Sequence, residues 1–182
     1  MPEEILVRYC SPTLAGIKTG SLFTCTFTDT DELKASLRRW NTTLGTKGLR
    51  AIPMRWSAGR ALIYLYRPGR LDNDLNREKA SRILSQRGYC PGCPGKCLAE
   101  LMRRLRQRED FPHEIGLFLG YPPEDVEGFI ENRECCKCTG CWKVYGDVET
   151  AQKTFAKYQK CTNVYCGLYA QGRSIEKLTV AS

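Results

Sequence analysis

Two neighbouring β-forming stretches in the first part of the chain constrain the fold most. Leu49–Trp56 and Arg60–Arg67 flank Ser57-Ala58-Gly59, which has the length and composition of a hairpin turn. The second stretch is continuously apolar over Leu62–Tyr66, which is typical of a central strand. Pro53 cannot donate to a neighbouring strand, so it predicts that the first stretch lies at a sheet edge or contains a bulge.

The other predicted elements do not alternate strictly between strand and helix. Strands are predicted at Ser21–Phe27 and Trp142–Tyr145. Helical patterns occur at 30–44, 73–86, 95–108, 112–119, 122–132, after Asp147, and around Ile175–Val180. This order argues against a doubly wound parallel sheet. It predicts an α+β fold in which a small, largely antiparallel sheet has helices packed against it.

A chain of 182 residues is the size of one domain, so we expect a single α+β domain over residues 1–182. Its 42% hydrophobic and 26% charged residues exclude a disordered, collagen-like or low-complexity protein. No apolar run approaches about 18 residues, and the first residues lack the pattern of a signal peptide. We therefore expect no membrane helix and a cytoplasmic location.

Eleven cysteines are an odd number and argue against a complete disulfide framework. Clustered thiols in the cytoplasm more often bind metal or carry out redox chemistry. Cys90, Cys93, Cys138 and Cys141 form two C-x-x-C pairs, which together predict a zinc site or an iron–sulfur cluster. The cysteine-rich face would be formed by segments 90–97 and 135–141. The predicted role is redox or metal handling, with a redox protein as partner.

Two alternatives for these thiols remain open. Free, partly buried cysteines pack as small hydrophobic side chains. Alternatively, Cys90-Pro91-Gly92-Cys93 is a thiol–disulfide site, because it precedes the predicted helix 95–108 and a helix N-terminus favours a thiolate. Pro94 and Gly95 are expected to separate the motif from that helix, which weakens this alternative.

His113 is the only histidine and lies beside Glu114 near the start of a predicted helix. These two residues are the candidate catalytic pair, with His113 as a proton-transfer group or metal ligand. In the structural alternative, Glu114 favours the helix dipole and His113 bonds to backbone. An enzyme using His113 would need a concave pocket lined by that residue and by Cys10 or arginine side chains. Whether the protein is an enzyme is left open.

The formal net charge of +8 favours a third possible function, the binding of nucleic acid or of an acidic protein. Arg103, Arg104 and Arg106 on the helix that ends near residue 108 are the candidate contacts. Because basic residues are spread over the chain, nucleic acid is not favoured. The structural alternative is that the arginine stems cover apolar surface while their heads are solvated.

Three segments, Phe111–Ile130, Gly140–Asp147 and Cys10–Phe23, resemble a bacterial family known only as a domain of unknown function. The resemblance covers nearly the whole chain in matching order. It implies no activity, but it implies a shared task around His113. It also implies that an aromatic residue is usual at the position of Cys141, so the thiol-rich loop is particular to this protein. Cys10 and Cys161 match the family's pattern.

Overall fold

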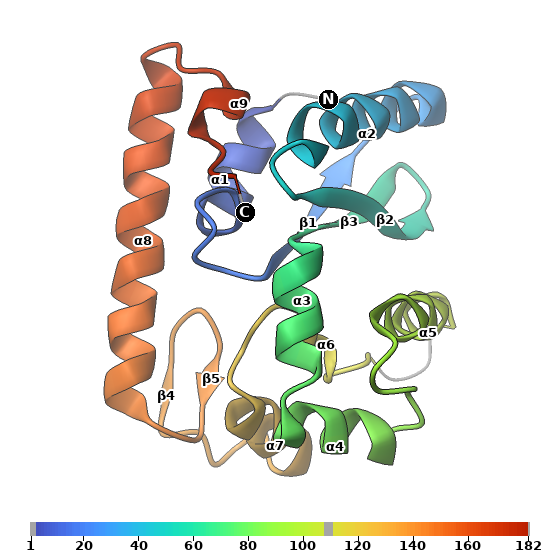
Figure 1. Ribbon diagram of the computed structural model, residues 1–182, viewed down its shortest axis with the longest axis vertical. Helices are drawn as coiled ribbons and strands as arrows, with labels where there is room; N and C mark the ends of the chain where they lie inside the picture. The colour runs from blue at the N-terminus through green and yellow to red at the C-terminus, as the bar shows by residue number, and fades with distance from the viewer. Residues whose placement is uncertain (1–2, 108–110, 182) are drawn as a thin grey trace. The chain divides into compact units, whose positions relative to one another are not determined.

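The computed structural model describes residues 3–107 and 111–181 (Figure 1). Its backbone divides into two compact units. The first unit comprises Met1–Gly69 and Tyr158–Ser182, and the second comprises Arg70–Lys157. The expectation of a single domain over residues 1–182 stays a prediction.

The first unit contains a three-stranded antiparallel sheet of β1 (Gly20–Thr26), β2 (Arg50–Ser57) and β3 (Arg60–Tyr66), in the order β1-β3-β2. The predicted central strand is therefore confirmed as β3. The hairpin turns at Gly59, whose φ of 67° suits glycine. Pro53 lies on the edge strand β2, and the register shifts between Pro53 and Arg55. Edge position and bulge both suit a residue without a backbone N–H.

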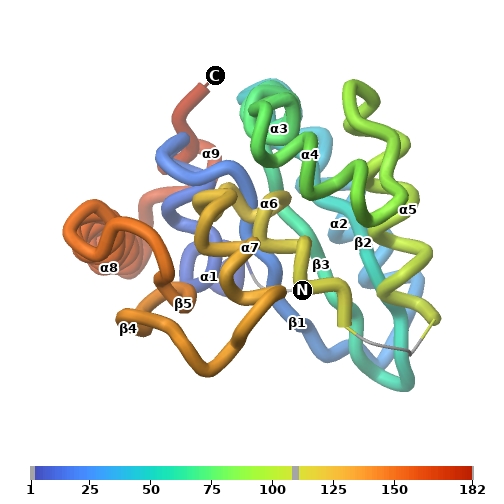
Figure 2. Tube along the Cα trace, turned by 90° about the horizontal axis from the view of Figure 1, so that it is seen from below, coloured from blue at the N-terminus to red at the C-terminus, as the bar shows by residue number. Residues whose placement is uncertain are grey.

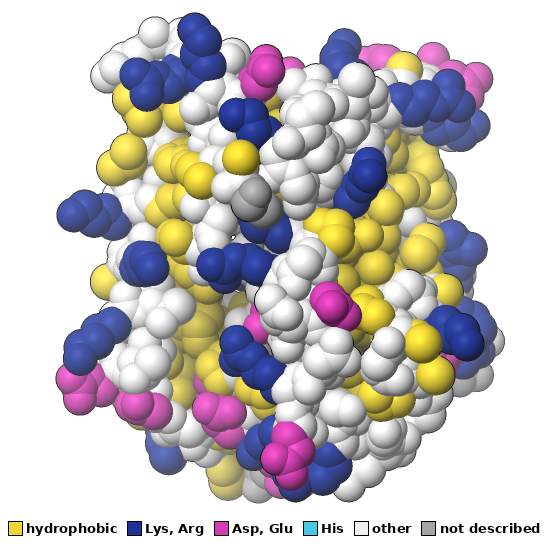
Figure 3. Space-filling model, viewed as in Figure 1, with side chains coloured by type: hydrophobic (Ala, Val, Ile, Leu, Met, Phe, Trp, Pro, Cys, Tyr) yellow, Lys and Arg dark blue, Asp and Glu magenta, His cyan; other side chains and the backbone are white. Residues whose placement is uncertain are grey.

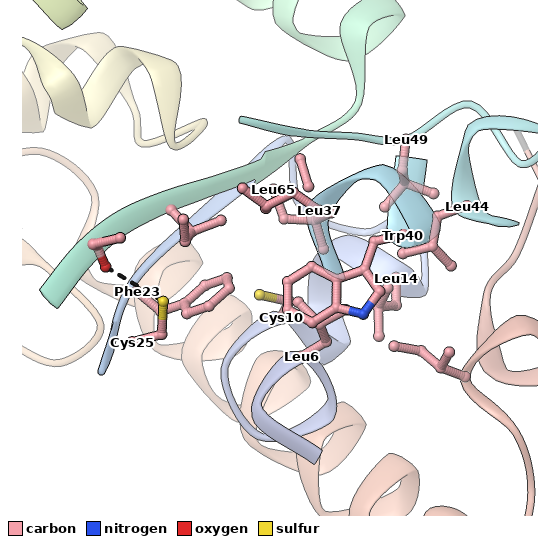
Figure 4. Packing of buried hydrophobic residues seen from close by; sticks show 14 of the residues in the cluster. Leu6, Cys10, Leu14, Phe23, Cys25, Leu37, Trp40, Leu44, Leu49 and Leu65 are labelled. Atoms are coloured by element: carbon pink, nitrogen blue, oxygen red, sulfur yellow. Dashed lines mark hydrogen bonds between the residues drawn. The ribbon is translucent and has the colours of Figure 1, made fainter. Parts of the chain in front are cut away.

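Helices α1 (Glu4–Leu14), α2 (Thr30–Gly45) and α9 (Ile175–Leu178) contribute to the core that forms against this sheet (Figure 4). Asp29 caps α2 by accepting a bond of 2.8 Å from the backbone N–H of Asp31. Alternate residues of the strands face the helices, because successive strand side chains point to opposite faces. The core includes Leu6, Cys10, Leu14, Phe23, Cys25, Leu37, Trp40, Leu44, Leu49 and Leu65.

Arg67 ties distant segments of the first unit together. Its side chain is buried and donates to the carbonyl oxygens of Thr13 and Leu14, each at 2.8 Å. The same guanidinium donates to the carbonyl oxygens of Lys47 at 3.3 Å and Val180 at 2.7 Å. The backbone N–H of Val180 also donates to the Leu14 carbonyl at 3.0 Å. One buried cation therefore satisfies carbonyls from both ends of the sequence.

The second unit is mainly helical. It includes most of α3 (Pro68–Leu75), together with α4 (Glu78–Gln86), α5 (Pro94–Arg106), α6 (Ile115–Phe118), α7 (Pro123–Glu131) and a hairpin of β4 (Cys138–Thr139) and β5 (Lys143–Val144). Helix α8 (Val148–Ala170) begins in this unit and continues in the first. Figures 1 and 2 show α6, α7 and the β4–β5 hairpin side by side. The α+β prediction is confirmed.

Several predicted boundaries were wrong. The single helix predicted over 73–86 is two helices, because Arg77 adopts an extended conformation (φ −60°, ψ 137°) and starts α4. Just before it, Asn76 still bonds to Asp72 through both its backbone and its side chain, as in a last helical turn, so the break falls at Arg77. Helix α1 was not predicted, because Pro12 within it argues against a helix.

The later elements also differ in length from their predictions. Helix α5 begins at Pro94, whose fixed φ suits a first helical position, and it ends at Arg106. Arg108, which the predicted helix included, lies outside the described residues. The helices predicted over 112–119 and 122–132 shorten to α6 and α7. The strand predicted at Trp142–Tyr145 shortens to β5, which pairs with the unpredicted β4.

Candidate functional site

A pocket of about 210 Å³ lies in the second unit, among residues of α6, α7 and the β4–β5 hairpin. Its lining is mostly apolar and aromatic and includes His113 and Lys143. Phe129, Trp142 and Cys141 also line it. The pocket thus contains the histidine that the sequence singled out and one cysteine of the predicted metal site. The requirement stated for an enzyme is met only in part, because His113 lines a concave pocket but neither Cys10 nor an arginine does.

Asp125 holds the hairpin against α7. Its buried carboxylate accepts from the Trp142 indole N–H at 2.7 Å and from the backbone N–H groups of Tyr145 and Gly146, each at 2.8 Å. Three donors therefore satisfy this acid, which lies in the first turn of α7. Because the indole is one of those donors, Asp125 fixes the orientation of a pocket wall.

Gly116 permits the close packing of α6 on α7. A Cβ atom at this position would lie 2.7 Å from Cγ2 of Val126 and 3.2 Å from Cδ2 of Tyr121. Tyr121 in turn stacks on Trp142, with the ring centroids 4.8 Å apart. A larger residue at position 116 would push two pocket-lining side chains away from their places.

His113 lies just before α6 and packs among aromatic rings. Its imidazole is 5.0 Å from the Phe129 ring in an edge-on arrangement and 5.7 Å from the Phe111 ring. Its Nε2 contacts the guanidinium of Arg133.

Two cations flank the same aromatic ring. The guanidinium of Arg133 is 5.4 Å from the centroid of Phe129, and the ammonium of Lys143 is 5.9 Å from it. Lys143 also donates to the backbone carbonyl of Arg133 at 2.9 Å. These contacts place positive charge beside His113.

Glu114 does not line this pocket. Its side chain is 1% exposed. Oε1 accepts from the Tyr89 hydroxyl at 2.8 Å and from Arg104 at 3.1 Å, and Oε2 accepts from Arg87 at 3.3 Å. Burial, together with the adjacent Glu114 carboxylate, raises the pKa of Tyr89, which therefore remains a hydroxyl donor. His113 and Glu114 are adjacent in the sequence but have different surroundings. His113 lines the pocket, whereas Glu114 is buried and hydrogen-bonded to Arg87, Tyr89 and Arg104.

The candidate basic residues of α5 are engaged to different extents. Arg103 donates two bonds of 2.7–2.8 Å to Glu100, and Arg104 donates to both Glu100 and Glu114. Hydrogen bonds from Arg103 and Arg104 lower the pKa of Glu100 to about 2. Arg106 is exposed. On the face drawn in Figure 3, Lys and Arg side chains occur in several separate groups rather than in one patch.

The first cysteine cluster surrounds the start of α5. Cys90 is exposed, Cys93 is partly buried and Cys97 is buried. Cys93 is the residue that immediately precedes the helix, so Pro94 and Gly95 form its first turn. The expectation that these two residues separate the motif from the helix was wrong, because proline is well suited to that first turn.

The second cluster lies on and before the β4–β5 hairpin. Cys138 is in β4 and Cys141 is in the hairpin turn, where its carbonyl accepts from the Tyr121 hydroxyl at 3.4 Å. Cys135 contacts the Asn132 amide at 3.1 Å. Across residues 3–107 and 111–181, no three His, Cys, Asp or Glu side chains are grouped closely enough to hold a metal ion. The zinc or iron–sulfur site stays a prediction, which metal and sulfide analysis of anaerobically purified protein tests.

Cys10 lies in the core of the first unit with Cys25. Burial raises the pKa of the Cys10 thiol to about 12 and also raises that of Cys25. Both are therefore unreactive packing residues. Cys161 lies on α8 and is partly buried.

Sequence reasoning did not single out Asp125, Phe129, Arg133 or Lys143. What they share is that they lie in or near Phe111–Ile130 and Gly140–Asp147, two of the segments that resemble the family of unknown function. These two segments contribute most of the pocket lining. A pocket assembled from short elements 30 residues apart has no periodic pattern that would reveal it.

Among the helices of the described residues, none has the length and apolar character needed to cross a membrane. No curated protein and no solved structure matches the chain. A family model described as "Protein of unknown function (DUF3793)" matches residues 6–179. Because this match covers nearly the whole sequence, the chain belongs to the DUF3793 family, which confirms the resemblance seen in its motifs.

Proposed function

We propose that the second unit binds a small aromatic anion in the His113 pocket. The observation that carries this proposal is that aromatic side chains, His113 and Lys143 together line a single concave space. Pockets with apolar walls and a few convergent polar groups are the usual places for small ligands. His113 supplies a side chain that can form hydrogen bonds with a ligand.

The size of the pocket favours a ligand of one or two rings. Its volume of about 210 Å³ is below the range of about 300–1,000 Å³ for pockets that bind drug-sized molecules. It would hold about seven waters at about 30 Å³ each. Phe129 and Trp142 in the lining offer ring faces and edges, which favour a planar partner through stacked or edge-to-face contacts.

The charges favour an anion over a cation. Asp125 is the acidic residue in the lining, and its oxygens already accept three hydrogen bonds. By contrast, Lys143 donates one bond to a backbone carbonyl, and an ammonium group has three donors. A carboxylate on the ring would therefore meet a cation with remaining donor capacity.

Proton NMR tests the proposal because the chain has one histidine, whose imidazole signals need no assignment. Benzoate is the probe, benzyl alcohol is the same ring without the charge, and acetate is the charge without the ring. We expect benzoate to shift the His113 signals saturably with a Kd of about 1 mM, as about 0.5 kcal/mol per heavy atom predicts. The other two probes should bind more weakly.

The Lys143→Gln variant removes the charge and keeps most of the stem. We expect about tenfold weaker benzoate binding, because a hydrogen bond to a charged group contributes about 1.5 kcal/mol. Benzyl alcohol binding should be unchanged. Lys177→Gln, an exposed lysine on α9, is the matched control. Equal shifts from benzoate and acetate, or no saturation with benzoate, would contradict the proposal.

A further inference from the structure

We propose that Cys90 and Cys93 form a thiol–disulfide exchange site that reacts with low-molecular-weight disulfides of the glutathione type. Cys97 is a positioning residue of this site and stays reduced. The inference concerns the start of α5 and does not depend on ligand binding in the His113 pocket.

The geometry of the turn brings the two thiols together. Cys90 and Cys93 are the ends of a four-residue turn with Pro91 and Gly92 in its centre, and Gly92 has a φ of 80°. Proline followed by a positive-φ glycine is the signature of a type II turn, whose end Cα atoms lie within about 7 Å. Disulfides join residues whose Cα atoms are about 4.4–6.8 Å apart. The turn therefore lies at the spacing that a disulfide needs.

The site is also open to a reagent. Cys90 is exposed, and Cys93 is partly exposed. Apart from its chain neighbours and the backbone of its own helix, a Cβ atom built on Gly92 or on Gly95 would have no heavy atom within 4 Å. Both glycines thus border open space, which leaves room for a small disulfide near the turn.

Cys97 forms hydrogen bonds to both ends of the turn. Its buried thiol donates to the carbonyl oxygen of Cys90 at 3.2 Å, and its backbone N–H donates to the carbonyl oxygen of Cys93 at 3.0 Å. The two ends of the turn are thereby bonded to one residue of the first turns of α5. Cys97 is buried, whereas Cys90 is exposed and Cys93 is partly exposed, so an added disulfide reaches those two sulfurs rather than that of Cys97.

The exchange proceeds in two balanced steps. The Cys90 thiolate attacks one sulfur of the added disulfide, whose S–S bond breaks, giving a mixed disulfide and one released thiol. The Cys93 thiolate then attacks the Cys90 sulfur and releases the second thiol. The protein loses two electrons and two protons and gains a Cys90–Cys93 bond. The added disulfide is reduced to two thiols.

Trypsin digestion gives a direct readout of the bond formed. Cleavage after Arg87, Lys96 and Arg103 separates Gly88–Lys96, which holds Cys90 and Cys93, from Cys97–Arg103. Reduced full-length protein is treated with oxidised glutathione, quenched with an alkylating agent and digested. We expect neither thiol of Gly88–Lys96 to be alkylated, because both are held in a disulfide. The mass of this peptide should be lower than that of the unalkylated reduced peptide by the hydrogens lost in forming the bond. Cys97 should be alkylated.

Variants separate the roles of the three thiols. Cys93→Ser should trap glutathione on Cys90, because the second step cannot occur. Cys97→Ala should slow the exchange, and Cys97→Ser should restore it, because a hydroxyl can donate to the Cys90 carbonyl where a methyl group cannot. A purely packing role for Cys97 would not separate these two variants. The exposed Cys166→Ser on α8 is the matched control and should behave as the wild type.

The same digest contains a second C-x-x-C peptide, Cys138–Lys143, in which Cys138 is held in a strand. We expect Gly88–Lys96 to oxidise first. Retention of both alkylated thiols in Gly88–Lys96, a cross-link from that peptide to Cys97–Arg103, or equal oxidation of the two C-x-x-C peptides would overturn the proposal.

Discussion

Replacing Glu114 by glutamine tests whether this sequence neighbour of His113 is structural. The side chain of Glu114 is 1% exposed, and Arg104, Arg87 and Tyr89 donate to it. Removing one member of a buried ion pair costs about 3–5 kcal/mol. An amide keeps one acceptor oxygen, and Arg87, which is 36% exposed, can turn its head to water. We therefore expect Glu114→Gln to lower the free energy of unfolding by about 2–3 kcal/mol.

Urea and thermal unfolding of the full chain measure this loss. For a chain of this size, about 2–4 °C is lost per kcal/mol, so the midpoint should fall by about 5–10 °C. Glu131→Gln on α7 is the control, because Glu131 is exposed and its substitution should stay within about 0.5 kcal/mol. The shift of the His113 signals by benzoate should survive in folded Glu114→Gln protein. Wild-type stability combined with loss of benzoate binding would refute the structural role.

Three further predictions concern stability. Arg67→Met leaves four carbonyls without their buried donor and should cost about 3–5 kcal/mol in urea unfolding; a loss below about 1 kcal/mol would show that water replaces the guanidinium. Burial raises the Cys10 pKa from 9.0 to about 12, so the thiol keeps its proton to a higher pH in the folded state than in the unfolded state. The stability advantage of wild type over Cys10→Ala should therefore fall by about 1.4 kcal/mol per pH unit between pH 9 and 12, and a constant difference would contradict this. Gly116→Ala should cost about 1–3 kcal/mol and weaken benzoate binding, because its Cβ would lie 2.7 Å from Val126; unchanged affinity would argue against the pocket.

The sheet was predictable because its signals are local. Pro53, the apolar run of β3 and the turn at Gly59 each act within a few residues, and together they define an edge strand and a central strand. Helix α1 was not predictable in the same way. It contains Pro12, whose cost in a helix is offset by the burial of Leu6, Cys10 and Leu14, which only the tertiary fold provides.

The site was predictable only in part. His113 was identified because it is the only histidine, and its pocket requires contacts with Phe129 and Lys143 that no spacing rule relates to it. The burial of Glu114 could not be predicted either. A glutamate near a helix start is usually solvated, whereas here Arg87 and Arg104, which are 27 and 10 residues away, make burial acceptable. Pairing over such distances leaves no mark in a single sequence.

The hydrogen bond between Arg67 and Val180 can form only late in the synthesis of these residues. The first unit draws on residues from both ends of the sequence, and residues 70–157 of the second unit lie between them. A ribosome adds about 5–20 residues each second, so about ten seconds separate the emergence of Gly69 from that of Val180. During that time the sheet and α1 exist without their last segment, while every residue of the second unit is made. The Arg67 guanidinium therefore stays incompletely bonded until Val180 has been made, and the first unit can be completed only after every residue of the second has been synthesised.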